Sequence, residues 1–203
     1  MIELHNIDCM EYLATLEDNA FELAIVDPPY GIGDFSQSDG AYKGRIQWNE
    51  TTPDKAYFDE LKRVSLNQII WGANYYNCFS KKGGAIIWDK LNMHPQMSRC
   101  EIASASFGVR VAHVTILHHG GSAKMHGNFH PCGKPISLYE WLLMNYAKEG
   151  DRILDTHLGG GSIAIACHNL GFDLVGCELD TDYFNAATKR LEQHQSQLRI
   201  PML

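Results

Sequence analysis

The feature that most constrains the fold is a series of short, continuous apolar runs that alternate with segments of helical periodicity. Most runs are rich in Ile, Val and Leu without polar alternation, which is typical of strands covered on both faces. The predicted strands are residues 21–26, 68–71, 85–88, 152–154 and 174–177, and the predicted helices are residues 9–16, 53–66, 136–147, 162–170 and 183–195. This alternation predicts an α/β fold, with helices on both faces of a mostly parallel sheet.

Two further runs, residues 101–107 and 109–117, follow one another with only Gly108 between them. Strand-like runs joined by a short glycine turn are typical of an antiparallel hairpin. We therefore predict a hairpin that turns at Gly108 at one side of the sheet.

No internal repeat or long linker divides the chain, so residues 1–203 are expected to form a single domain. Two segments, residues 31–52 and 119–129, resist regular structure; plain disorder and functional loops both explain their composition. Aromatic and basic side chains together suit contact with nucleic acid. The candidate nucleic-acid contacts in these loops are Lys43, Arg45, Trp48 and Lys124.

Charge is unevenly distributed along the chain. The net charge is −7, yet residues 81–134 hold seven basic and two acidic side chains, a local charge of +5. A local basic surface can bind phosphates whatever the total charge is. A chance bias in a solvated stretch is the alternative.

Several other classes of protein are excluded. No apolar run approaches the ~18 residues that a membrane span needs, and the first residues lack the pattern of a signal peptide. We therefore expect an intracellular, cytoplasmic protein. The six cysteines include no C-x-x-C pair, which argues against a disulfide framework or a zinc ribbon. His118, His119, His126 and His130 fit polar or phosphate-contacting roles better than a metal site, so no metal is expected.

A glycine-rich turn is the best-placed signal for a small molecule. A predicted strand ends at Asp155 and passes through Gly159 and Gly161 into the helix that begins at Ser162, and Glu178 ends the next strand. This arrangement is typical of a nucleotide-binding site, because it combines backbone N–H groups at a helix N-terminus with a carboxylate suited to two ribose hydroxyls. Asp155 would repel a pyrophosphate but attract a cation, which favours S-adenosylmethionine over NAD. A glycine helix cap without any ligand is the third reading.

The sharpest motif is Asp27-Pro28-Pro29-Tyr30 at the end of the predicted strand 21–26. The two prolines take the chain out of the sheet at its carboxyl edge, where open α/β sheets bind ligands. A planar base could stack on Tyr30 while its amino group donates to the Asp27 carboxylate and the Pro28 carbonyl. Two such acceptors would aim the amine lone pair at a sulfonium methyl group and stabilise the positive charge that develops. A strand-ending Pro-Pro turn with a solvated Asp is the alternative.

With these motifs, the chain resembles the amino-methylating DNA methyltransferases of the permuted (β) arrangement, in which the tetrad precedes the glycine motif. The segment 130–135 resembles the His-Pro-Thr-Gln-Lys-Pro segment of that family, with Cys132 and Gly133 in place of Thr and Gln, and Thr156 and His157 replace Pro and Phe. The resemblance implies a Rossmann-like fold with a seven-stranded sheet, double-stranded DNA as substrate, base flipping and S-adenosylmethionine as cofactor. It implies that Asp27, Pro28, Pro29 and Tyr30 are catalytic, and that cofactor contacts come from Asp8, Cys9, Lys134, Asp155, His157, Gly159, Gly161, Ser162 and Glu178.

The resemblance leaves several alternatives open. Asp at the first tetrad position indicates N6 of adenine as the target, with N4 of cytosine, an RNA base or a protein amide as alternatives. A non-catalytic DNA-binding or nucleotide-sensing module is the third class. We expect that the chain has no separate target-recognition domain, which makes a homodimer a reasonable hypothesis, and a cognate restriction endonuclease cannot be read from the sequence. Beyond the motifs, Asn74, Tyr75, Asp89 or Lys90 could line the base pocket.

Overall fold

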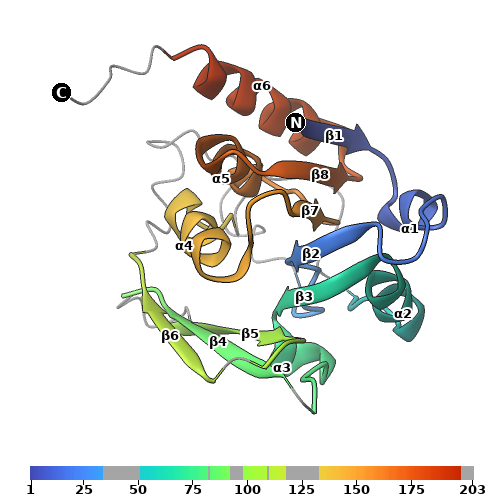
Figure 1. Cartoon of the computed structure of the whole chain (residues 1–203), viewed down its shortest axis with the longest axis vertical. Coiled ribbons are helices and arrows are strands. Elements are labelled where there is room, and N and C mark those ends of the chain that lie inside the picture. The colour runs from blue at the N-terminus through green and yellow to red at the C-terminus, as the bar shows by residue number, and fades with distance from the viewer. Residues whose placement is uncertain (34–50, 82, 92–97, 109, 118–132, 198–203) are drawn as a thin grey trace.

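The computed structural model describes residues 1–33, 51–81, 83–91, 98–108, 110–117 and 133–197 (Figure 1). It forms one eight-stranded sheet in the order β1-β8-β7-β2-β3-β5-β4-β6. The strands are β1 (Ile2–Asn6), β2 (Phe21–Val26), β3 (Ser65–Trp71), β4 (Gly84–Asp89), β5 (Cys100–Ala105), β6 (Ala112–Thr115), β7 (Arg152–Asp155) and β8 (Asp173–Glu178). The helices are α1 (Cys9–Leu13), α2 (Lys55–Val64), α3 (Ala73–Tyr76), α4 (Ile136–Tyr146), α5 (Ser162–Leu170) and α6 (Thr181–Gln195).

The strand pairing confirms a mostly parallel sheet, since only the two pairs made by β5 are antiparallel among the described residues. The expected number of seven strands is wrong, because β1 adds an eighth beside β8, with Leu4 opposite Gly176. β1 escapes the apolar pattern because Glu3 and His5 interrupt it. An edge strand tolerates such residues because one of its sides faces no neighbouring strand.

The predicted hairpin of residues 101–107 and 109–117 is also wrong. β5 is instead inserted between β3 and β4, where Ala103 lies opposite both Trp71 and Ile86, and β6 runs parallel to β4. The small buried side chains of Ala103 and Ala105 fit the crowded centre of the sheet, whereas residues 112, 113 and 115 of β6 are partly or fully exposed at the edge. Burial across the sheet therefore decides the pairing, and the glycine between the two runs does not.

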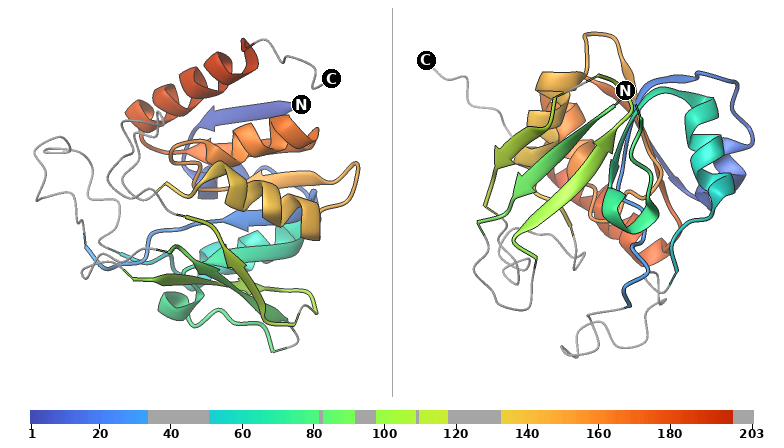
Figure 2. Two further views of the ribbon diagram at one scale, coloured as in Figure 1. Left: turned by 90° about the vertical axis from the view of Figure 1, so that its left-hand side faces the viewer. Right: turned by 90° about the horizontal axis from the view of Figure 1, so that it is seen from below.

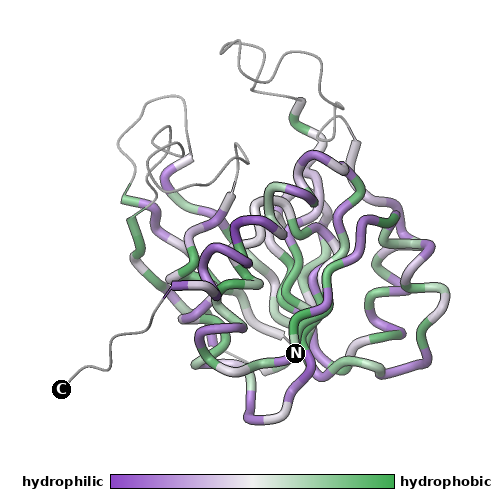
Figure 3. Tube along the Cα trace, turned by 90° about the horizontal axis from the view of Figure 1, so that it is seen from above, coloured by the Kyte–Doolittle hydropathy of each residue, from purple (hydrophilic) through white to green (hydrophobic). Residues whose placement is uncertain are grey.

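Helices cover both faces of the sheet, as predicted (Figure 2). Leu13 of α1 and Leu61 of α2 pack against Ala24 and Val26 of β2 on one face. On the other face, α4, α5 and α6 pack against a larger core that includes Leu23, Ile25, Trp71 and Trp88. Hydrophobic segments concentrate in the strands between the two helical layers (Figure 3). Among the described residues, no helix has the length and apolar character needed to cross a bilayer.

The helix boundaries follow local capping chemistry. α5 has the predicted bounds and ends at Gly171, whose φ of 79° is left-handed. α2 begins after Asp54, whose carboxylate accepts from the Tyr57 N–H at 3.1 Å; the expected start at Thr52 and Pro53 is therefore too early. α3 was not predicted, since a single short turn carries no periodic signal.

Candidate active site

The carboxyl ends of the adjacent parallel strands β1, β8, β7, β2 and β3 bring the predicted site residues to one edge of the sheet. Glu178 ends β8, Asp155 ends β7, and Asp27 follows β2 directly. β7 and β2 are paired neighbours, with Leu154 opposite Ala24. The glycine turn and the Asp-Pro-Pro-Tyr tetrad therefore lie side by side, as predicted.

The glycine turn after β7 is tied to the acid at the end of β8. The Gly159 N–H donates to Glu178 Oε2 at 2.8 Å, and the Asp180 N–H donates to Glu178 Oε1 at 3.0 Å. Gly159 and Gly161 have φ of 53° and 70°, a left-handed conformation that glycine adopts at little cost. These bonds leave the Glu178 carboxylate fixed at the strand end, and burial raises its pKa.

Helix α6 braces the same turn from outside. Arg190 Nη1 donates to the Gly160 carbonyl at 2.5 Å and to Ser162 Oγ at 3.1 Å. A Cβ on Gly161 would meet the Ala187 Cβ at 3.0 Å, so α6 packs closely against the turn. Arg190 was not predicted, because nothing in the local pattern of α6 distinguishes it from the neighbouring Lys189.

Asp155 is a buried carboxylate at the centre of this region. Its Oδ1 accepts from the His157 N–H at 2.9 Å, and its exposed fraction is 1%. Burial, together with the nearby charges of Asp27 and Glu178, raises the pKa of Asp155 to about 7. A carboxylate in this setting is well suited to pair with a cationic ligand group.

Asp8 and Cys9 lie at the beginning of α1. Asp8 caps the helix, accepting from the Met10 N–H at 2.7 Å. Burial and the charge of Asp8 raise the pKa of the Cys9 thiol to about 12, so the thiol stays protonated and uncharged.

His157 occupies the position where the resemblance has Phe. The Tyr57 hydroxyl contacts Thr156 Oγ1 at 2.7 Å, and Thr156 Oγ1 in turn contacts His157 Nδ1 at 2.9 Å. The Tyr57 and His157 rings also meet edge to face, with centroids 5.4 Å apart. Burial lowers the pKa of His157 to about 4, so its ring is neutral. A neutral, braced aromatic ring therefore takes the place of the usual Phe.

These residues fit S-adenosylmethionine on the chemistry of their donors. Three acids, Asp8, Asp155 and Glu178, lie at three adjacent strand ends. Together with the N–H groups of the glycine turn and the neutral His157 ring, they suit an adenosine joined to a cationic amino acid. The buried carboxylate of Asp155 is the strongest sign, because it favours a positive partner.

The tetrad forms the second half of the site. The Tyr30 hydroxyl donates to Asp27 Oδ1 at 2.6 Å, and the Asp27 side chain is 20% exposed. The Pro28 carbonyl accepts from the Tyr76 hydroxyl, which also contacts the Pro29 carbonyl at 2.9 Å. A carbonyl oxygen has two lone pairs, so Pro28 can still accept from a second donor.

Neighbouring residues hold the Tyr30 ring in place. It stacks on Tyr75, with centroids 4.8 Å apart and planes inclined by 16°. A Cβ on Gly72 would come within 2.4 Å of the Tyr30 ring, and Gly72 has φ of 74°. Only glycine fits this position, which explains the Gly after Trp71. Residues 72, 75 and 76 therefore pack against the tetrad.

Lys134 lies against the tetrad and is paired with two carboxylates. Its ammonium forms ion pairs with Asp27 and, at 3.1 Å, with Glu101 Oε2, and its side chain is 2% exposed. It also donates to the Tyr30 hydroxyl at 3.2 Å. Lys90 pairs with the other oxygen of Glu101, so one of the candidates for lining the base pocket reaches this cluster. Glu101 was missed, because an isolated acid at the start of a strand gives no sequence signal.

Charge compensation controls the protonation of this cluster. Burial opposes ionisation of Glu101, but the ammonium groups of Lys134 and Lys90 outweigh it and lower its pKa to about 2. For Lys134, burial is likewise outweighed by Asp27 and Glu101, which raise its pKa. Burial raises the pKa of Asp27 despite the contact with Lys134.

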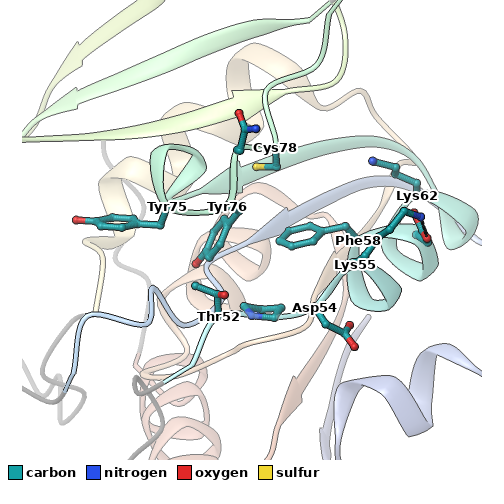
Figure 4. Close-up of a pocket in the computed structure, with 11 residues that line it drawn as sticks. Thr52, Asp54, Lys55, Phe58, Lys62, Tyr75, Tyr76 and Cys78 are labelled. Carbon is teal, nitrogen blue, oxygen red and sulfur yellow. Dashed lines mark hydrogen bonds and ion pairs between the residues drawn. The ribbon is translucent and has the colours of Figure 1, made fainter.

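A cavity of about 350 Å³ opens beside the tetrad, between the start of α2 and the segment after β3 (Figure 4). Tyr75 and Tyr76 belong both to its wall and to the surroundings of the tetrad. Its lining residues are Thr52, Pro53, Asp54, Lys55, Phe58, Asp59, Lys62, Tyr75, Tyr76, Asn77 and Cys78. The predicted DNA contacts Lys43, Arg45, Trp48 and Lys124 lie outside the described residues.

The fold, the glycine turn and the strand-end acids define an S-adenosylmethionine-dependent methyltransferase with a Rossmann-like sheet. The family model of the N6/N4 methyltransferases, described as DNA methylases, matches residues 68–189, more than half of the chain. The chain therefore belongs to the N6/N4 DNA methylase family and is an S-adenosylmethionine-dependent DNA methyltransferase.

Individual relatives agree with this family. The Type II methyltransferase M.HpaI of Haemophilus parainfluenzae is 23% identical over 227 residues, covering 91% of this chain and 72% of its own length. The structure of the M1.HpyAVI–SAM complex matches with a TM-score of 0.64 and 20% identity, over 94% of this chain and 99% of that one. The cytosine-N4-specific PvuII DNA methyltransferase matches with a TM-score of 0.67 and 12% identity, over 96% and 90% of the two chains. These structures share the fold.

Proposed function

We propose that this protein methylates the exocyclic N6 amino group of adenine in double-stranded DNA, after the base has been flipped out of the helix. The observation that supports this most is the position of the Asp27 carboxylate and the Pro28 carbonyl at the end of β2, directly beside the glycine turn of β7. A base amine held there would face a cofactor held by the neighbouring strand ends.

The chain's own residues carry out most of the chemistry in this proposal. S-adenosylmethionine, when bound, supplies a methyl group activated by its sulfonium. Asp27 accepts one amine hydrogen and the Pro28 carbonyl accepts the other, which draws the nitrogen lone pair out of the ring and toward the methyl carbon. As the nitrogen–carbon bond forms, the carbon–sulfur pair returns to sulfur, and the Asp27 carboxylate stabilises the positive nitrogen. The methylated nitrogen then loses a proton to Asp27 or water.

The cofactor would be held by Asp8, Cys9, Asp155, His157, Gly159, Gly161, Ser162 and Glu178, which share one edge of the sheet. Lys134 could also reach the methionine end of the cofactor, although its contacts here are with Asp27 and Glu101. Lys43, Arg45, Trp48 and Lys124 would contact DNA. A single domain and a homodimer on DNA both stay predictions.

N4 methylation of cytosine is the second candidate. The PvuII enzyme, which matches this fold, is cytosine-N4-specific. Both target amines would present two hydrogens to the same acceptors, and Asp at the first tetrad position favours adenine on the resemblance alone.

The test is methylation of genomic DNA from a strain without DNA methylation, followed by digestion and mass spectrometry of the nucleosides. We expect N6-methyladenine. N4-methylcytosine alone would contradict the choice of base, and parallel reactions with RNA and with protein test the other acceptors.

Asp27→Asn provides the matched test of mechanism. It keeps the size of the side chain but removes the charge that stabilises the developing cation, so the transfer rate should fall about 100-fold or more. Cofactor affinity, measured by calorimetry, should stay within about three-fold, because Asp27 binds the base. The exposed acid Glu149 provides the control Glu149→Gln, which should not change the rate. An unchanged rate for Asp27→Asn would exclude the role given to this carboxylate.

A further inference from the structure

Four buried or half-buried side chains form a row of alternating charge beside the tetrad. In order they are Lys90, Glu101, Lys134 and Asp27, and each contacts the next through an ion pair. Their side chains are 8%, 19%, 2% and 20% exposed, respectively. Two acids and two bases give the row no net charge, which is the condition for keeping such groups ionised away from water.

This arrangement creates a conflict at Asp27. The Lys134 ammonium contacts Asp27 Oδ2, and the Tyr30 hydroxyl donates to Oδ1 at 2.6 Å. A base amine that donates to Asp27 must share or displace one of these donors. In addition, a fixed ammonium would oppose the positive charge that grows on the amine nitrogen, because like charges a few ångströms apart repel strongly in a dry site.

Glu101 is an alternative ion-pair partner for the Lys134 ammonium. Its Oε2 already lies 3.1 Å from Lys134 Nζ and 3.2 Å from the Tyr30 hydroxyl, while its Oε1 is paired with Lys90. A small rotation of the Lys134 side chain would therefore give up Asp27 while keeping a carboxylate partner. Since an unpaired buried ammonium is costly, this second partner makes the release of Asp27 feasible.

We propose that Glu101 is a positioning residue for methyl transfer: it takes over the Lys134 ammonium when the target amine engages Asp27, while Lys90 holds Glu101 in place. Glu101 touches neither the base nor the cofactor in this role; it acts through Lys134. The proposal rests on the proposed function, since it concerns the same tetrad.

The test compares Glu101→Gln in two backgrounds, using the full chain and genomic DNA from a methylation-free strain. In the wild-type background, Glu101→Gln leaves Lys134 with Asp27 as its one anionic partner among the described residues. The single-turnover rate should fall about ten-fold or more, while cofactor affinity from calorimetry stays within about two-fold. In the Lys134→Met background no ammonium has to move, and the same substitution restores a neutral row of Lys90 and Asp27. There it should change the rate less than about two-fold, or raise it.

Controls separate this role from a merely structural one. Glu149→Gln removes an exposed acid and should leave the rate unchanged, and thermal unfolding reports whether each variant is folded. Glu101→Asp keeps the charge but shortens the side chain, so its rate should lie between those of the wild type and Glu101→Gln; it also replaces Glu101→Gln if that variant does not fold.

The outcomes are distinguishable. A wild-type rate for Glu101→Gln, or an equal loss in both backgrounds, overturns the proposal for Glu101 and leaves the proposed function standing. If the wild-type protein transfers no methyl group to DNA, both proposals fail.

Discussion

At the scale of single residues, the site concentrates buried carboxylates whose charge the protein itself only partly compensates. Asp27 forms an ion pair with Lys134, whereas Asp155 accepts one hydrogen bond, from a backbone N–H, among the described residues. This difference suits two ligands of different charge: a base amine that becomes positive only during transfer, and a cofactor that is positive throughout.

Asp155 should make the cofactor-free protein less stable as the pH rises. Its carboxyl group titrates near 3.8 in the unfolded chain and near 7 in the folded protein, so the folded state keeps the proton longer. Stability from this group is full below about pH 4 and is lost as the pH rises to about 7, by an amount on the order of 4 kcal/mol. Asp155→Asn abolishes the titration, so its melting temperature should exceed that of the wild type at pH 8 and approach it near pH 4.

The same Asp155→Asn variant should bind S-adenosylmethionine about ten-fold or more weakly, because the ligand no longer has a buried charge partner. Thermal unfolding between pH 4 and pH 8 and calorimetric titration measure the two effects, with Glu149→Gln as the control. A melting-temperature difference that does not vary with pH would contradict the role of this carboxyl group.

At the scale of elements, the glycine turn proposed to bind the cofactor is held by a helix that contributes no predicted ligand. α6 closes on the turn through Ala187 against Gly161 and through Arg190 against the Gly160 carbonyl. If the turn were mobile, ligand binding would have to order it. The conformational entropy lost in doing so would weaken binding. If the turn binds the cofactor as proposed, this brace should link α6 to cofactor affinity.

Arg190→Met tests this brace. It keeps much of the packing but removes the bonds to Gly160 and Ser162, so we expect a loss of about 1–2 kcal/mol in stability and about ten-fold in cofactor affinity. Lys189→Met, on the exposed side of the same helix, is the matched control and should change neither. Equal behaviour of the two variants would show that α6 does not order the turn.

At the scale of the whole molecule, catalysis and DNA contact are assigned to different parts of the chain. The proposed catalytic and cofactor residues lie at the carboxyl edge of the sheet, whereas the predicted DNA contacts fall in the segments 31–52 and 119–129. Such a division would allow DNA affinity to change without loss of the chemistry.

A double variant, Lys43→Ala with Arg45→Ala, tests that division. A side chain that neutralises one phosphate contributes about 0.9 to the slope of log affinity against log salt, so the double variant should have a slope smaller by about two units. Cofactor affinity should be unchanged. Fluorescence anisotropy of labelled duplex DNA at several salt concentrations measures the slope, and an unchanged slope would place the phosphate-binding residues elsewhere.

The sequence alone determined what local chemistry can determine. The strand, glycine turn and helix around Asp155–Ser162 follow from capping and backbone freedom within a few residues, and α5 has the predicted bounds. The Asp-Pro-Pro-Tyr tetrad is contiguous, so its position at a strand end could be predicted from the prolines and the apolar run before it. The class of fold followed from periodicity, which is also local.

Only the tertiary structure decided which distant segments meet. β5 lies between β3 and β4 because its small side chains fit that buried position, and no turn residue encodes this choice. The insertion places Glu101 between Lys90 and Lys134, beside Asp27. None of these side chains stands out in its own segment. Their charges interact strongly only because burial removes water and long-range strand pairing makes them neighbours.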